Sequence, residues 1–198
     1  EDEYVSNRTK EQERYDLIKE YNTDLDEVQG YHGREILELL QNADDAEATS
    51  VEIILRDEEL VFKHNGKKHF DITEEGAEQV GDINSITGIG DSTKIESQNK
   101  IGKFGVGFKA VFQYSDVPEV YDDTFKFKIE NYIIPTLLDH DHPERKAGET
   151  LFVFPFKDKA KSHKDISERL QKLQNPLLFL HSLEKISWRI DFHGQKGK

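Results

Sequence analysis

The segment from Glu35 to Ala46, with the sequence EILELLQNADDA, most constrains the fold because it sorts its side chains onto two faces of one helix. Three apolar residues recur at i, i+4 and i+7, the spacing of a stripe that faces a hydrophobic core: Ile36, Leu40 and Ala43. A carboxylate, an amide and a second carboxylate recur at the same spacing on the other face: Glu38, Asn42 and Asp45. We therefore predict a helix over residues 34–47 with one apolar and one functional face.

The polar face of this helix has the groups that a metal-bound phosphate needs. Asn42 can offer a neutral oxygen to Mg²⁺, and Glu38, one turn away, can polarise a water molecule that attacks a phosphate. The alternative is an ordinary surface helix whose polar face is solvated. The helix alone does not decide between these two interpretations.

A glycine cluster lies further along the chain, where Gly102, Gly105 and Gly107 precede an apolar run. Glycines let the backbone approach a ligand closely, and free N–H groups at the start of a helix bind anions. The backbone amides of residues 105–108 are therefore candidate phosphate ligands. The cluster is not a Walker A loop, because Phe108 stands where that motif has lysine, and it does not match the dinucleotide fingerprint. A tight structural turn is the alternative.

The remaining pattern predicts short strands and helices without strict alternation, which indicates an α+β fold with a mixed or antiparallel sheet. Helices are expected at 9–21, 73–80, 105–114 and 163–173, strands at 50–56, 60–63, 119–121, 124–129, 150–156 and 185–192, and a long loop at 81–100.

Composition narrows the function further. The 198-residue chain has a net charge of −13, so nucleic acid is not an expected partner. It has no cysteine, which excludes disulfides, thiolate catalysis and cysteine zinc sites and fits the cytoplasm. No apolar run is long enough to span a membrane. The start lacks a methionine, and we expect a single domain over 1–198 that is a fragment of a larger multidomain protein.

Three segments together resemble the GHKL (Bergerat-fold) ATPases. ELLQNADDA at 38–46 is similar to the family's Glu-x-x-x-Asn-x-x-Asp-Ala box, and IGKFGVGF at 101–108 is similar to the glycine box of the heat-shock-chaperone branch. Gly148-Glu149-Thr150 resembles the family's Gly-Thr element, with one residue inserted. The resemblance spans about residues 30–157. The sacsin-type N-terminal ATP-binding domains are the most similar branch, on the basis of QNADDA, the His64-Asn65-Gly66 turn and the run GDSTK at 90–94.

The resemblance implies a two-layer sandwich with a mixed, mostly antiparallel sheet, helices on one face and an ATP lid at 84–100. It implies Glu38 as general base and Asn42 as Mg²⁺ ligand, with ATP as substrate. The other nucleotide-binding residues that it implies are Asp45, His64, Asn65, Ser92, Thr93, Lys94, Gly102, Lys103, Phe104, Gly105, Val106, Gly107, Phe108 and Thr150.

One departure concerns the adenine base. His64 stands where most of the superfamily has the aspartate that accepts the adenine amino group, and either Asn65 or a neutral imidazole nitrogen could accept that hydrogen bond instead. His64 could equally be structural.

The function implied by the resemblance is slow ATP hydrolysis that switches a larger chaperone-like or defence-type machine. Other domains of the parent chain, and a second copy of the chain in a nucleotide-dependent dimer, are the expected partners. A non-hydrolysing nucleotide-sensing scaffold is the alternative. A histidine kinase is a third option, although no phospho-acceptor helix pair precedes the domain.

Three further features are given structural interpretations. Residues 139–142 (DHDH) are expected to form a solvated turn rather than a metal site. The basic run at 157–164 is expected to start a helix, and Trp188 is expected in the core.

Overall fold

A seven-stranded sheet forms the centre of the computed structural model, which describes residues 34–74, 81–87, 108–173 and 176–191. The strand order is β5-β4-β3-β6-β2-β1-β7, and neighbours are antiparallel except for the parallel pair β1 and β7. The strands are β1 Ser50–Arg56, β2 Glu59–His64, β3 Glu119–Tyr121, β4 Lys126–Glu130, β5 Ile134–Leu137, β6 Thr150–Pro155 and β7 Lys185–Asp191. The predicted α+β class with a mixed, mostly antiparallel sheet is confirmed.

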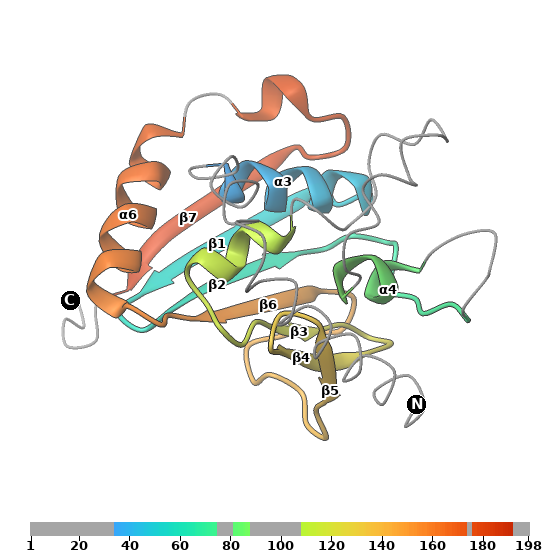
Figure 1. The fold of residues 1–198 in the computed structure, drawn as a ribbon. Coiled ribbons are helices and arrows are strands. Elements are labelled where there is room, and N and C mark those ends of the chain that lie inside the picture. Colours follow the sequence, from blue (N-terminus) through green and yellow to red (C-terminus); the bar gives the residue numbers. More distant parts are fainter. Residues whose placement is uncertain (1–33, 75–80, 88–107, 174–175, 192–198) are drawn as a thin grey trace, which may run out of the picture.

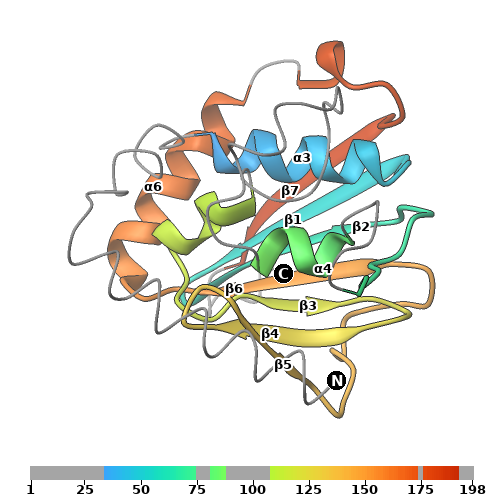
Figure 2. The same cartoon turned by 45° about the vertical axis from the view of Figure 1, so that its right-hand side comes forward.

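The helices cover one face of this sheet (Figures 1 and 2). They are α3 Glu35–Asp45, α4 Asp82–Thr87, α6 Lys159–Lys172 and two 3₁₀ helices, η1 Phe108–Gln113 and η2 Pro176–Phe179. In both views α3 lies across the strands next to η1, although about sixty residues of chain separate them.

The main hydrophobic core lies between the helices and the sheet. The predicted stripe Ile36, Leu40 and Ala43 is buried there, together with Phe152 of β6 and Ile166 of α6. Burial of large apolar side chains is the main favourable term in folding, so this layer holds α3 on the sheet. A smaller cluster on the opposite face packs residues of the central strands: Ile54, Val61, Tyr121, Leu151 and Val153.

Most of the elements expected from the sequence are present. The strand at 50–56 has the predicted bounds, and the predicted helices at 34–47 and 163–173 correspond to α3 and α6. The basic run at 157–164 starts α6, whose first turn is capped by Asp158 through a hydrogen bond from the backbone N–H of Lys161. The helix expected at 9–21 lies outside the described residues.

Four expectations need correction. Residues 82–87 form α4 rather than a loop, and residues 108–113 of the helix expected at 105–114 form a 3₁₀ helix. Strand β5 was not expected from the sequence. Trp188 lies in the edge strand β7 with 41% of its surface exposed, so it is not a core residue. Among the described residues no helix is long and apolar enough to cross a membrane.

Candidate functional site

The functional face predicted for the first helix lies on α3. Glu38 and Asp45 are half-buried, whereas Asn42 is buried at 9% exposure. Within the described part of the chain, the amide Nδ2 of Asn42 has no hydrogen-bond partner. An unpaired buried amide is costly, so this side chain is one that a ligand could satisfy. Burial, followed by the negative charge of Asp44, raises the pKa of the Asp45 carboxyl.

Two buried carboxylates fix α3 in its orientation. Asp44 accepts hydrogen bonds from three consecutive backbone N–H groups of the loop before β7, at 2.7–3.0 Å: those of His181, Ser182 and Leu183. Glu35 is paired with Arg169 of α6, and the Tyr114 hydroxyl donates to Glu35 at 3.5 Å. Because Tyr114 directly follows η1, this cluster connects α3, η1 and α6.

The end of β2 docks against the end of α3 through Gly66. The backbone N–H of Lys67 donates to the carbonyl of Ala46 at 2.8 Å. A Cβ atom on Gly66 would lie 2.8 Å from the Cβ of Ala46 and 2.8 Å from Nδ1 of His64. Only glycine permits this close approach, so the predicted His64-Asn65-Gly66 turn is a packing element as well as a candidate binding element.

A cavity of about 110 Å³ lies at this junction of α3 and β2. Its lining combines charged, imidazole and apolar groups: Asp45, Ala46, His64, Lys68, His69, Phe70 and Asp82. Asp45 extends the polar face of α3 into the cavity. The structure thus brings Asp45 and His64, two of the predicted nucleotide-binding residues, to the walls of one cavity.

The His64 side chain is buried and neutral. Its Nδ1 atom accepts a hydrogen bond from the backbone N–H of Gly66 at 3.0 Å, and its ring packs 5.8 Å from that of Phe152. Burial lowers the pKa of His64 to about 4, although the nearby charge of Asp122 opposes this shift. Within the described ranges Nε2 of His64 has no hydrogen-bond partner.

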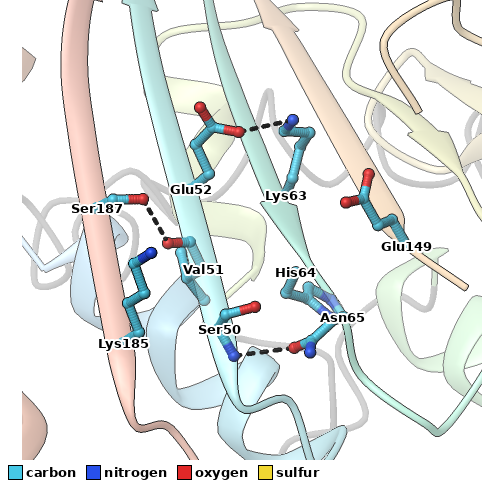
Figure 3. Close-up of a pocket in the computed structure, with 9 residues that line it drawn as sticks. All are labelled: Ser50, Val51, Glu52, Lys63, His64, Asn65, Glu149, Lys185 and Ser187. Carbon is cyan, nitrogen blue, oxygen red and sulfur yellow. Dashed lines mark hydrogen bonds and ion pairs between the residues drawn. The ribbon is translucent and has the colours of Figure 1, made fainter. Parts of the chain in front are cut away.

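The Asn65 side chain holds the start of β1. Its Oδ1 accepts hydrogen bonds from the backbone N–H groups of Thr49 and Ser50 at 3.0 and 2.9 Å, and its Nδ2 donates to Oγ1 of Thr49. Asn65 also lines a second, open cavity of about 320 Å³ on the sheet face away from α3 (Figure 3). Two of the charged side chains there, Lys63 and Glu52, form an ion pair at 2.7 Å.

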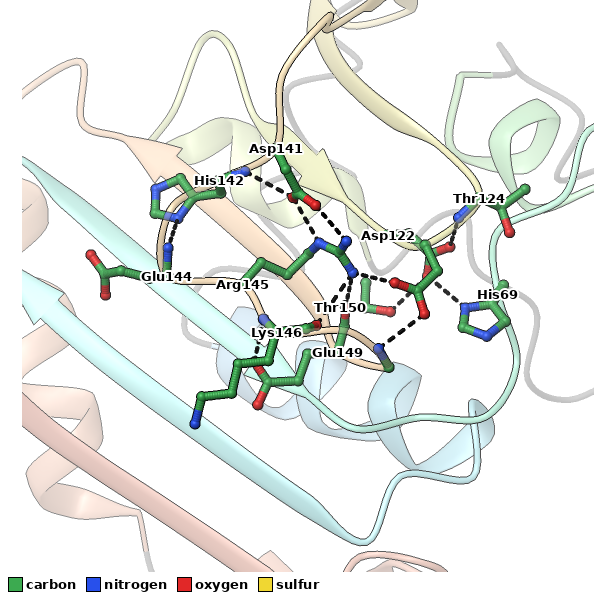
Figure 4. A network of polar contacts seen from close by, with 12 residues as sticks. His69, Asp122, Thr124, Asp141, His142, Glu144, Arg145, Lys146, Glu149 and Thr150 are labelled. Carbon is green, nitrogen blue, oxygen red and sulfur yellow. Dashed lines mark hydrogen bonds and ion pairs between the residues drawn. The ribbon is translucent and has the colours of Figure 1, made fainter.

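A buried carboxylate, Asp122, forms a network that the sequence did not indicate (Figure 4). Its Oδ2 accepts a hydrogen bond from Thr150 Oγ1 at 2.8 Å and lies 3.1 Å from Nδ1 of His69. Its Oδ1 accepts from the backbone N–H of Thr124. Thr150 is the register partner of His64 across β6 and β2, so this network lies directly beside the cavity.

Arg145 holds the loop behind this network. Its guanidinium donates to both carboxylate oxygens of Asp141 and to Asp123, the neighbour of Asp122. The segment 139–142 that contains Asp141 is therefore part of a structural clamp (Figure 4). In the described ranges no group of three or more histidine, aspartate or glutamate side chains could hold a metal ion.

Several predicted site residues lie outside the described residues. They are Ser92, Thr93, Lys94 and the glycine box from Gly102 to Gly107, which includes Lys103, Phe104, Gly105 and Val106. Phe108, the last residue of the box, starts η1 and its side chain is completely buried beside Phe152 and Phe154. The described structure thus shows where the glycine box ends: next to α3.

Comparisons with known proteins agree with the fold and the motifs. The model of the sacsin domain matches residues 21–131. The chain is 31% identical over 183 residues to Protein NO VEIN of Arabidopsis thaliana, covering 78% of this chain and 6% of that protein. It is 29% identical over 128 residues to Sacsin of Homo sapiens, covering 54% of this chain and 3% of that protein.

Among solved structures, a crystal structure of the N-terminal domain of a DNA repair protein is similar with a TM-score of 0.43 and 19% identity. The likeness covers 70% of this chain and 40% of that chain.

The fold and motifs define an α+β domain of the sacsin type. The chain belongs to the sacsin-domain family, which confirms the resemblance seen in the sequence. It spans less than a tenth of the length of either named relative, so in those proteins the matching region is one part of a much longer chain.

Proposed function

We propose that this domain binds ATP together with Mg²⁺ and hydrolyses it slowly, as a conformational switch within a larger protein. The observation that supports this most is that Glu38 and the buried Asn42 lie one turn apart on the same face of α3. Among the described residues Nδ2 of Asn42 has no hydrogen-bond partner, so it could donate to a phosphate oxygen while the side-chain oxygen faces the metal ion. That face continues through Asp45 into the cavity beside β2. The family membership supports the same class of activity.

The residues on α3 fit a Mg²⁺–triphosphate. When bound, Mg²⁺ would neutralise phosphate charge, which is what the ion supplies in phosphoryl transfer. Asn42 would hold it through its side-chain oxygen, and phosphate oxygens and water would complete the shell that Mg²⁺ prefers. Glu38, half-buried one turn earlier, would accept the proton of the attacking water.

The rigid mounting of α3 supports a positioned catalytic pair. Asp44 holds α3 to the loop before β7. Glu35 holds it to Arg169 of α6 and to Tyr114, which follows η1. Glu38 and Asn42 therefore lie on a helix that is fixed at three places. Catalytic groups need placement to within a fraction of an ångström, which such anchoring provides.

Isothermal titration calorimetry and a phosphate-release assay on Glu38→Gln test this proposal. We expect turnover to fall at least about 100-fold, the typical contribution of a general base, while ATP affinity with Mg²⁺ stays within about threefold of wild type. Gln41→Ala, an exposed change on the same helix, is the matched control and should leave both values unchanged. Unchanged turnover in Glu38→Gln would remove Glu38 as the base.

The alternative is a domain that senses nucleotide without hydrolysing it. The side-chain oxygen of Asn65 already accepts hydrogen bonds from Thr49 and Ser50. This favours weak ATP binding, because it removes one candidate acceptor for the adenine amino group. The same two measurements separate the alternatives. Saturable ATP binding without turnover in wild type would support the sensor.

A further inference from the structure

Strand β7 is an open edge of the described sheet. It has seven residues, Lys185–Asp191, and among the described strands it pairs only with β1. The other edge strand, β5, has four residues and contains Pro135, which has no N–H group to donate to a further strand. Short length and proline protect a sheet edge from pairing, and β7 has neither. We propose that β7 pairs antiparallel with β7 of a second copy of this chain.

The side chains of β7 alternate between the two faces of the sheet. Ile186 and Ile190 pack against the core between the helices and the sheet, and Trp188 lies between them in the alternation with an exposed side chain. The opposite face of β7 is polar, and Figure 3 shows two of its side chains beside β1. Its residues are Lys185, Ser187, Arg189 and Asp191.

A two-fold axis at Trp188 makes β7 complementary to itself. In an antiparallel pair, residues directly opposite each other lie on the same face of the sheet. With the axis at Trp188, this side chain meets its own copy, and Ile186 meets Ile190 of the second copy. Lys185 meets Asp191 of the second copy, and the symmetry repeats this ion pair on the other side of the axis. All seven residues of the strand are then paired.

Charge favours this register over its two neighbours. An axis at Ser187 would oppose Lys185 to Arg189 of the second copy, and an axis at Arg189 would oppose the two arginines directly. Like charges directly opposite each other destabilise a strand pair, whereas opposite charges stabilise it. Of the three registers, the one centred on Trp188 alone has two opposite-charge pairs and no like-charge pair.

The groups that a second copy would meet are accessible. Lys185 is exposed, and in the part of the chain that the structure describes it belongs to no ion pair. Asp191 accepts hydrogen bonds from Arg189 of its own strand at 3.1 and 3.2 Å, and a carboxylate has lone pairs for a further donor. Trp188 is an exposed aromatic side chain, the kind that contributes most at the centre of an interface.

The proposed dimer is closed. The pairing uses the β7 edge of both copies and produces one continuous sheet with twice the seven strands, which has a protected β5 at each end. The helices of both copies cover the same face of this sheet, and a two-fold arrangement does not propagate into a fibre. We expect a dissociation constant of roughly 1–100 µM, because one strand pair buries less area than a standard interface.

Sedimentation velocity of the full chain, without nucleotide, measures this association over roughly 1–500 µM. Trp188 is the only tryptophan, so its fluorescence reports on the interface alone. We expect the emission to shift to shorter wavelength as the dimer forms, with the same midpoint concentration, because the ring leaves water. Trp188→Ala should weaken association at least about tenfold. Leu137→Ala, at an exposed position of β5, is the matched control and should leave it unchanged.

Charge reversal tests the register. Lys185→Asp leaves carboxylates at both positions of the ion pair, and Asp191→Lys leaves ammonium groups at both. Each variant should therefore self-associate at least about tenfold more weakly than wild type. An equimolar mixture of the two variants should associate again, because every carboxylate then opposes an ammonium group. Glu184→Lys, at the exposed position before β7, is the control. Loss of structure in either variant would not produce recovery in the mixture.

Two results would overturn the inference. One is a wild-type chain that sediments as a monomer over the whole range, or that dimerises with no change in Trp188 emission. The other is a mixture of the charge-reversal variants that associates no more strongly than either variant alone. Because the measurements contain no nucleotide, their result does not depend on the proposed function.

Discussion

The carboxylate of Asp44, at the end of α3, lies 2.9 Å from the backbone nitrogen of His181, a residue 137 positions later in the chain. Two further N–H groups, those of Ser182 and Leu183, point to the same carboxylate. Helix α3 is thereby attached to the segment that leads into β7, so the last strand of the sheet contributes to the placement of Glu38 and Asn42.

Replacement of Asp44 tests this attachment. We expect Asp44→Ala to lower the free energy of unfolding by roughly 2–4 kcal/mol, because three backbone N–H groups, of which that of Leu183 is buried, lose a charged acceptor. Urea unfolding followed by circular dichroism measures it. Glu184→Ala removes one negative charge from an exposed position in the same loop and should change stability little. If both substitutions lowered the free energy of unfolding by a similar amount, the loss would be due to the charge and not to the hydrogen bonds.

The same site has a defined pH dependence. Burial alone would raise the pKa of Asp44, but the hydrogen bonds from residues 181–183 outweigh it and leave the pKa below its usual value. The stability that Asp44 contributes relative to Asp44→Asn is therefore complete above about pH 4 and decreases as the pH falls through the folded-state pKa.

The pair of Arg169 and Glu35 predicts a second effect. In Arg169→Met the buried carboxylate of Glu35 loses its cationic neighbour, and we expect a loss of about 3 kcal/mol. Glu35→Leu combined with Arg169→Met should recover part of this loss, because neither charge remains. Lys172→Met, on an exposed position of α6, is the control for loss of positive charge. Thermal unfolding of the four proteins provides the measurement, and a double variant no more stable than Arg169→Met would contradict a charge-pair explanation.

His64 predicts a pH dependence of its own. Its pKa is about 4 in the folded chain and about 6.5 in an unfolded one, so the unfolded state takes up the proton first as the pH falls. Stability is complete above about pH 6.5 and decreases by roughly 3 kcal/mol towards pH 4. His64→Phe should remove that part of the pH dependence, whereas His140→Phe, at an exposed site, should not. An imidazole titration by NMR that gives His64 an ordinary pKa would contradict the burial argument.

The sequence was sufficient where one local pattern determined the structure. The two stripes of residues 35–46 predicted both the buried and the polar face of α3, and strand β1 was predicted to the residue. The glycine of the turn at residue 66 could be recognised as special, but its close contact with Ala46 depends on how β2 meets α3.

The sequence was insufficient where the structure depends on contacts between segments that are far apart in the chain. His69 and Asp122 are 53 residues apart and belong to no spacing motif, so their pairing required the sheet order. Four of the six residues of helix α4 are small and polar, a composition typical of loops. The helix is held by Asp71, which accepts a hydrogen bond from the backbone N–H of Asp82. Strand β5 contains Pro135, which is tolerated because β5 is at the edge of the sheet.

The position of β6 has a practical consequence for fragment design. Residues 150–155 fall after the stretch that matches the sacsin domain, yet they lie between β3 and β2 in the middle of the sheet. A recombinant piece trimmed at residue 131 would retain β1, β2, β3 and β4 but lose the strand that joins the two halves. Truncation to the region that matches the sacsin domain would thus leave β2 and β3 each with an unpaired edge in the middle of the sheet. Unpaired strand edges promote aggregation.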